Sequence, residues 1–102
     1  MVNKQAPETV IKYAVFLRKS NPAIKKIYLF GSYVKGTFHN DSDIDLAVVF
    51  DHLPDRFDMQ VELMKMRRNF DNRIEPHPFI EADFNPSDPL ANEVLKNGIE
   101  IA

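Results

Sequence analysis

Residues 24–50 read IKKIYLFGSYVKGTFHNDSDIDLAVVF. Two apolar segments in this stretch, Ile24 to Phe30 and Asp43 to Phe50, are rich in β-branched and aromatic side chains, which predicts two buried strands. The first segment ends at a Gly-Ser pair, and the second begins with an Asp-x-Asp pattern. Ser32 to Gly36 suits a short helix, and residues 37–42 are typical of a turn. The stretch therefore predicts a strand, a short helix and a second strand.

The Gly-Ser pair and the two aspartates suggest chemistry on a phosphate group. Gly31 lets the backbone approach a bulky anion, and the N–H groups at a helix start, with the Ser32 hydroxyl, suit phosphate oxygens. Asp43 and Asp45 are two residues apart, so on a strand they are expected to share one face, with Cα atoms about 6.6 Å apart. Such a pair repels unless a cation lies between, and oxygen ligands favour Mg²⁺ or Mn²⁺. The two aspartates alone are equally compatible with a solvated strand end.

The rest of the chain predicts helices packed on a sheet. Helical spacing covers about residues 7–19, a segment that opens at residues 53–55, and residues 86–96. In the middle segment Phe57, Val61 and Met64 share a stripe, with Leu63, Met66 and Phe70 beside it, and these Met and Phe side chains are expected to fill the core.

One further strand is predicted over Asn72 to Glu81, and Ile99 to Ile101 suits a short final strand. Pro76 and Pro78 cannot donate hydrogen bonds to a neighbouring strand, so the first of these strands is expected at an edge of the sheet or at a bulge. The order of elements predicts the α/β (α+β) class.

Composition restricts the class of protein. The chain has 102 residues, which predicts a single domain over residues 1–102. Its net charge of −2 does not favour a general nucleic-acid-binding surface. It contains no cysteine, and therefore no disulfide or thiolate metal site. Residues 1–10, MVNKQAPETV, lack the apolar region of a signal peptide, and no apolar run could span a bilayer. We therefore expect a cytoplasmic protein without a membrane partner.

The spacing Gly31-Ser32, ten residues, then Asp43-x-Asp45 resembles the signature of the DNA polymerase β-like nucleotidyltransferase superfamily. The text LFGSYVKGTFHNDSDIDLAVV is similar to its minimal nucleotidyltransferase branch, the antitoxins of toxin–antitoxin systems that pair with HEPN toxins. The resemblance implies a mixed sheet with flanking helices and transfer of a nucleoside monophosphate from an NTP. It also implies that Gly31 and Ser32 contact the phosphates and that Asp43 and Asp45 bind Mg²⁺.

The resemblance further implies a third carboxylate on the next strand, and Glu75 is the candidate. Many family members carry aspartate there, so glutamate is a departure that moves the carboxylate by about 1 Å. Glu75 would bind metal and take the proton from the attacking hydroxyl; the alternative is an exposed strand residue. His77 follows at i+2 on the same face, where it contacts substrate or has a structural role. We expected a metal site of carboxylates, without a histidine ligand.

The resemblance implies a Mg²⁺-dependent protein adenylyltransferase that uses ATP as a nucleotide substrate and modifies a hydroxyl on a HEPN-domain partner. Two alternatives belong to other classes. In the first, the chain is a non-catalytic antitoxin that neutralises a HEPN ribonuclease by docking. In the second, the acceptor is a small molecule such as an aminoglycoside, for which the chain offers few residues to build a pocket.

Overall fold

The computed structural model describes residues 6–39 and 41–101. The expectation that residues 1–10 are not a signal peptide falls partly on residues 1–5, which lie outside the described residues. Four strands form one sheet in the order β3-β2-β1-β4. Their bounds are β1 (Ile24–Phe30), β2 (Ile44–Phe50), β3 (Ile74–Ile80) and β4 (Ile99–Glu100). β1 is antiparallel to β2 and β4, whereas β2 and β3 are parallel. The mixed sheet with flanking helices is confirmed, and β1 has the predicted bounds.

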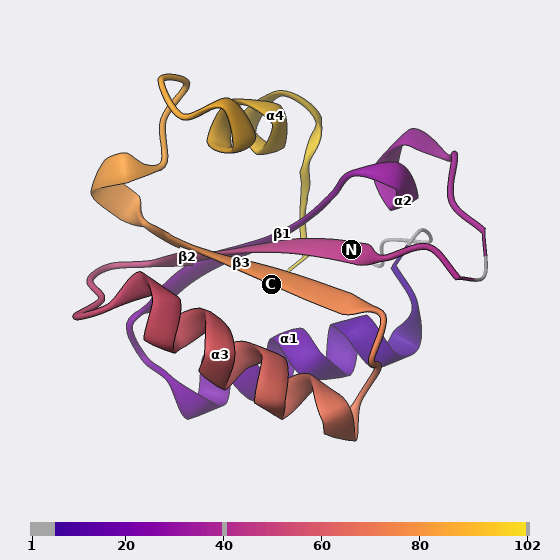
Figure 1. Ribbon diagram of the computed structural model, residues 1–102, viewed down its shortest axis with the longest axis horizontal. Helices are drawn as coiled ribbons and strands as arrows, with labels where there is room; N and C mark the ends of the chain where they lie inside the picture. Colours follow the sequence, from indigo (N-terminus) through magenta and orange to yellow (C-terminus); the bar gives the residue numbers. More distant parts are fainter. Residues whose placement is uncertain (1–5, 40, 102) are drawn as a thin grey trace.

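Helices cover both faces of the sheet (Figure 1). α1 and α3 lie side by side on one face, whereas α4 lies on the other, and α2 follows β1 at one end of the sheet. The helices are α1 (Glu8–Ser20), α2 (Ser32–Lys35), α3 (Arg56–Met66) and α4 (Pro89–Asn97), with 3₁₀ turns at Arg67–Asn69 and Glu81–Asp83. Within the described ranges, no helix combines the length and apolarity needed to cross a membrane.

Alternation along β2 divides the core into two layers. Leu46 and Val48 belong to the buried cluster under α1 and α3, whereas Ala47 and Val49 belong to the cluster under α4. Successive side chains of a strand point to opposite faces, so Asp45 points to the α4 side. α4 covers only part of that face, and Asp45 keeps 26% of its side chain exposed.

β3 is an edge strand, as its two prolines predicted. Side chains of α3 bond to the carbonyls of both prolines. Gln60 Nε2 donates to the Pro76 oxygen over 2.9 Å, and Arg56 Nε donates to the Pro78 oxygen over 2.6 Å. These bonds fix α3 against the edge strand that it precedes.

The predicted core stripe of α3 is wrong at Phe57 and Val61, whereas Met64 is half-buried. Phe57 is 75% exposed and Val61 is 36% exposed, while Leu63 is 1% exposed and points into the core. Tyr13 of α1 donates a 2.6 Å hydrogen bond to the Leu63 carbonyl, which fixes this part of α3 against α1. Packing against α1 and the sheet therefore selected a different face of α3 from the one that periodicity favoured.

Candidate functional site

The register of the sheet brings distant site residues into one row. Phe30 of β1 is the partner of Asp45 on β2, and Asp45 is the partner of Glu75 on β3. Gly31 directly follows Phe30 and therefore lies at the end of the same row. Partners in a parallel pair point to the same face, so the Asp45 and Glu75 carboxylates meet above the sheet. The parallel crossover through α3 thus joins two acids that are 30 positions apart in sequence.

Gly31 has two structural reasons to be glycine. Its φ is +78°, which side chains with a Cβ rarely adopt. A Cβ at this position would also collide with Oδ2 of Asp45. The turn is held by the N–H groups of Val34 and Lys35, which both donate to the Gly31 carbonyl over 3.1 Å. The Gly-Ser turn therefore approaches the Asp45 carboxylate closely, and a side chain would push it away.

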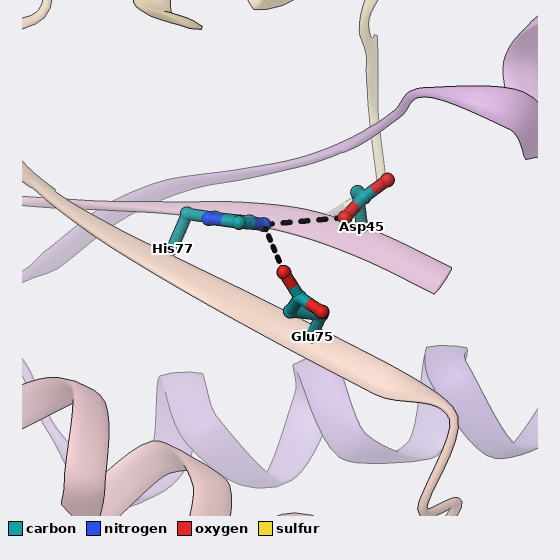
Figure 2. A group of neighbouring side chains, drawn as sticks. All are labelled: Asp45, Glu75 and His77. Atoms are coloured by element: carbon teal, nitrogen blue, oxygen red, sulfur yellow. Dashed lines mark hydrogen bonds and ion pairs between the residues drawn. The ribbon is translucent and has the colours of Figure 1, made fainter. Parts of the chain in front are cut away.

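Asp45, Glu75 and His77 form a compact cluster on this face (Figure 2). Nε2 of His77 lies 3.2 Å from Oδ1 of Asp45 and 3.6 Å from Oε1 of Glu75. The exposed fractions of the three side chains are 26% for Asp45, 43% for Glu75 and 20% for His77. The cluster is therefore accessible from solution.

The donor set fits a divalent cation. One ligand atom from each of Asp45, Glu75 and His77 lies within 4.8 Å of the other two. Carboxylate oxygens suit Mg²⁺ and Mn²⁺, and imidazole suits transition metals. The expected site contained only carboxylates, whereas the structure places an imidazole nitrogen among the candidate ligand atoms. The i+2 spacing from Glu75 on one strand was the available signal for His77.

The other predicted residues lie around this cluster. Ser32 is the first residue of α2 and is half-buried. Asp43 is exposed and precedes β2, which begins one residue later than expected, at Ile44. In the parts of the chain that the structure describes, Asp43 does not belong to the three-residue cluster. Lys35, at the end of α2, places its Nζ 3.6 Å from Oε2 of Glu93 on α4.

A hydrogen-bonded group at the start of β3 supports the site. Asp71 accepts from Arg73 Nη2 over 2.7 Å and from the Thr9 hydroxyl of α1 over 2.7 Å. The Arg73 hydrogen bond, followed by that of Thr9, lowers the pKa of Asp71 to about 2, against the opposing effect of burial. Arg73 also donates to the Tyr33 hydroxyl of α2 over 3.1 Å. This group links α1, α2 and β3 two residues before Glu75.

A family model described as "Polymerase beta, Nucleotidyltransferase" matches residues 11–102. The chain therefore belongs to this nucleotidyltransferase family, and the match extends well beyond the Gly-Ser and Asp-x-Asp motifs. The resemblance inferred from residues 28–50 is confirmed.

Individual relatives carry more specific descriptions. The protein adenylyltransferase MntA of Shewanella oneidensis is 53% identical over 38 residues, which are 37% of this chain and 27% of that protein. A toxin–antitoxin crystal structure with AMP-PNP is 26% identical, with a TM-score of 0.60, over 98% of this chain and 73% of that one. A tri-AMPylated Shewanella oneidensis HEPN toxin in complex with MNT antitoxin matches at 23% identity and a TM-score of 0.55, over 89% and 66% of the two chains. The last match shows the shared fold.

Proposed function

We propose that this protein is a cytoplasmic adenylyltransferase that moves AMP from ATP to a hydroxyl of a partner protein, a HEPN-domain toxin. The proposal treats residues 1–102 as one catalytic domain. It rests on the family match, on the short but closely similar segment of MntA, and on the AMP-PNP-containing toxin–antitoxin structure.

One observation carries the proposal. The Gly31 turn, Asp45 and Glu75 converge at one end of the sheet, so close that a Cβ on Gly31 would strike Asp45. A turn suited to phosphate oxygens beside carboxylates suited to a metal is the arrangement that nucleotidyl transfer needs. Gly31, Asp45 and Glu75 are far apart in the sequence, and the register of the sheet brings them together.

Each residue has a role in the proposed reaction. Gly31 and Ser32 contact the β- and γ-phosphates, which places the α-phosphorus beside the carboxylates. Asp43, Asp45 and Glu75 would hold Mg²⁺, which when bound would supply stabilisation of charge on the attacking and leaving oxygens. Glu75 accepts the proton of the acceptor hydroxyl. The hydroxyl oxygen forms a bond to the α-phosphorus, the bond to the β-phosphate oxygen breaks, and pyrophosphate leaves.

The exposed cluster favours a protein as the acceptor. Glu75 keeps 43% of its side chain exposed, so a docked surface can reach it directly. Ligand pockets for small molecules normally bury most of the ligand. A protein partner instead orients its hydroxyl through contacts remote from the reacting atoms.

Transfer of label from ATP tests the proposal. Purified protein is incubated with Mg²⁺ and α-labelled ATP, with and without the protein encoded by its neighbouring gene as the candidate partner. We expect label on the partner with wild-type protein and its loss with Asp43→Asn or Asp45→Asn. Asp51→Asn, at the opposite end of β2, is the charge-matched control and should retain transfer. Efficient labelling of a free small molecule without the partner would contradict a protein acceptor.

Exposed aromatic side chains favour a second candidate, neutralisation by docking alone. Phe57 on α3 is 75% exposed and Phe16 on α1 is 40% exposed, and aromatic side chains are enriched at protein interfaces relative to the rest of the surface. The double variant Asp43→Asn, Asp45→Asn separates the candidates in cells that express the toxin. Survival would show that docking suffices, whereas loss of protection with an intact complex would assign the function to catalysis.

A further inference from the structure

We infer that His77 is a direct ligand of the metal position beside β3, so that this position takes two carboxylate oxygens and one imidazole nitrogen. The ligand set makes the position selective for Mn²⁺ over Mg²⁺. This inference rests on the proposed function, because it concerns the metal site of that reaction.

The distances around Nε2 of His77 match a shared coordination sphere. Nε2 lies 3.2 Å from Asp45 Oδ1 and 3.6 Å from Glu75 Oε1. Two donors that each lie about 2.2 Å from one ion, at an angle of about 90–110°, are separated by about 3.1–3.6 Å. The two carboxylates and the ring therefore have the separations of neighbouring ligands around one ion.

A hydrogen bond alone accounts less well for this arrangement. Nε2 carries at most one proton, yet it faces an oxygen of Asp45 and an oxygen of Glu75 (Figure 2). A neutral imidazole can satisfy only one of these acceptors with a linear bond. A cation among the three atoms satisfies both carboxylates and the nitrogen lone pair together.

The fold orients the ring for this role. The register partner of His77 on β2 is Ala47, whose small side chain leaves room for the ring to reach Asp45. The ring also packs against Phe30 of β1, with centroids 5.4 Å apart, and only 20% of the side chain is exposed. Packing of this kind restricts the rotamers of a ligand and favours metal affinity.

The two carboxylate oxygens of Asp45 face different groups. Oδ2 faces the Gly31 turn, where the phosphates are proposed to bind, whereas Oδ1 faces His77. His77 therefore affects only the position on the β3 side. Imidazole binds transition-metal ions better than Mg²⁺, and Mn²⁺ is the transition-metal ion that also prefers carboxylate oxygens, so this position differs from a site made of carboxylates alone.

Pulsed electron paramagnetic resonance of the full chain with Mn²⁺ alone tests the inference. Omitting nucleotide removes the nitrogen atoms of the base from the spectrum. We expect a coupling from a directly bound imidazole nitrogen in wild-type protein. Protein labelled with ¹⁵N-histidine should convert that coupling to the ¹⁵N pattern.

Glutamine at position 77 separates ligation from positioning. The His77→Gln amide can still donate a hydrogen bond to Asp45 but provides no imidazole nitrogen. We expect loss of the nitrogen coupling and a fall in Mn²⁺ affinity of at least about 10–100-fold, the loss typical of changing a group that only orients a ligand. The change in Mg²⁺ affinity, measured by competition, should be much smaller. His52→Gln, on an exposed loop, should match wild type in both measurements.

Three outcomes would overturn the inference. They are bound Mn²⁺ without nitrogen coupling, His77→Gln with unchanged Mn²⁺ affinity, and equal losses of Mg²⁺ and Mn²⁺ affinity. If His77→Gln does not fold, as judged by circular dichroism, His77→Asn replaces it, and the labelled wild-type spectrum alone still decides. These measurements are independent of AMP transfer, so the inference can fail while the proposed function holds, or the reverse.

Discussion

At the residue scale, Gly31 controls the position of the Asp45 carboxylate. We expect Gly31→Ala to lower the free energy of unfolding by about 1–3 kcal/mol, because φ of +78° with ψ of −147° is a conformation that essentially only glycine adopts. The new Cβ would also displace Asp45 Oδ2, so AMP transfer and metal binding should both fall sharply. Urea unfolding and the labelled-ATP assay measure the two effects.

Gly36→Ala is the matched control for this prediction. Gly36 also has a positive φ, +77°, but its ψ of 15° places it in the left-handed helical region, whereas Gly31 has ψ of −147°. Nothing lies within 4 Å of a Cβ built at Gly36. Gly36→Ala should therefore carry a smaller backbone cost than Gly31→Ala and leave metal binding unchanged. Equal losses of metal binding in both variants would show that the Asp45 contact is irrelevant.

At the scale of the element, α3 buries Leu63 and exposes Phe57. We expect Leu63→Ala to lower the free energy of unfolding by about 2–5 kcal/mol, since it leaves a cavity between α3 and α1. Phe57→Ser should stay within about 0.5 kcal/mol of wild type. If urea unfolding showed a larger loss of unfolding free energy for Phe57→Ser than for Leu63→Ala, the core face predicted from periodicity would be the correct one.

The start of α4 offers a second prediction at this scale. Asp88 accepts hydrogen bonds from the N–H groups of Leu90 and Ala91, at 2.9 and 3.2 Å. Asp88→Ala should lower the free energy of unfolding by about 1 kcal/mol, because it leaves these donors unpaired. Asp83→Ala removes the same charge from an exposed position and should be nearly neutral. Equal thermal shifts for the two variants would exclude the capping role.

At the scale of the whole molecule, Asp71 couples α1 to the start of β3. Its pKa is lowered to about 2 by hydrogen bonds from Arg73 and Thr9. The unfolded chain therefore binds this proton first as pH falls, so the stabilisation is complete above about pH 4 and is lost toward about pH 2. Asp71→Asn should weaken the decline of stability over this range, measured by urea unfolding at fixed pH values.

Asp51→Asn controls for the change in net charge, since Asp51 is exposed and its pair with His52 spans 3.7 Å. It should retain the pH dependence of wild type between about pH 4 and pH 2. An unchanged slope in Asp71→Asn would show that other carboxylates govern acid unfolding. The hydrogen bonds of Asp71 with Arg73 and Thr9 would then position β3 without contributing to the pH dependence of the free energy of unfolding.

The sequence by itself determined most of the elements and proposed most residues of the candidate site. Apolar runs and glycine or proline boundaries are local signals, so β1 was predicted over its observed bounds and β2 within one residue. The two prolines of β3 placed it at an edge for the same reason. The Gly-Ser and Asp-x-Asp spacing identified the family, which implied Gly31, Ser32, Asp43, Asp45 and Glu75.

Only the tertiary structure decided which of these side chains meet. The 3.2 Å distance between Nε2 of His77 and Oδ1 of Asp45 depends on the parallel register of β2 and β3. It also depends on the small side chain of Ala47, the register partner of His77. The face of α3 depends on Tyr13 and the sheet, which periodicity within α3 cannot include. Both features arise from contacts between segments far apart in the chain, where packing and register prevail over local preference.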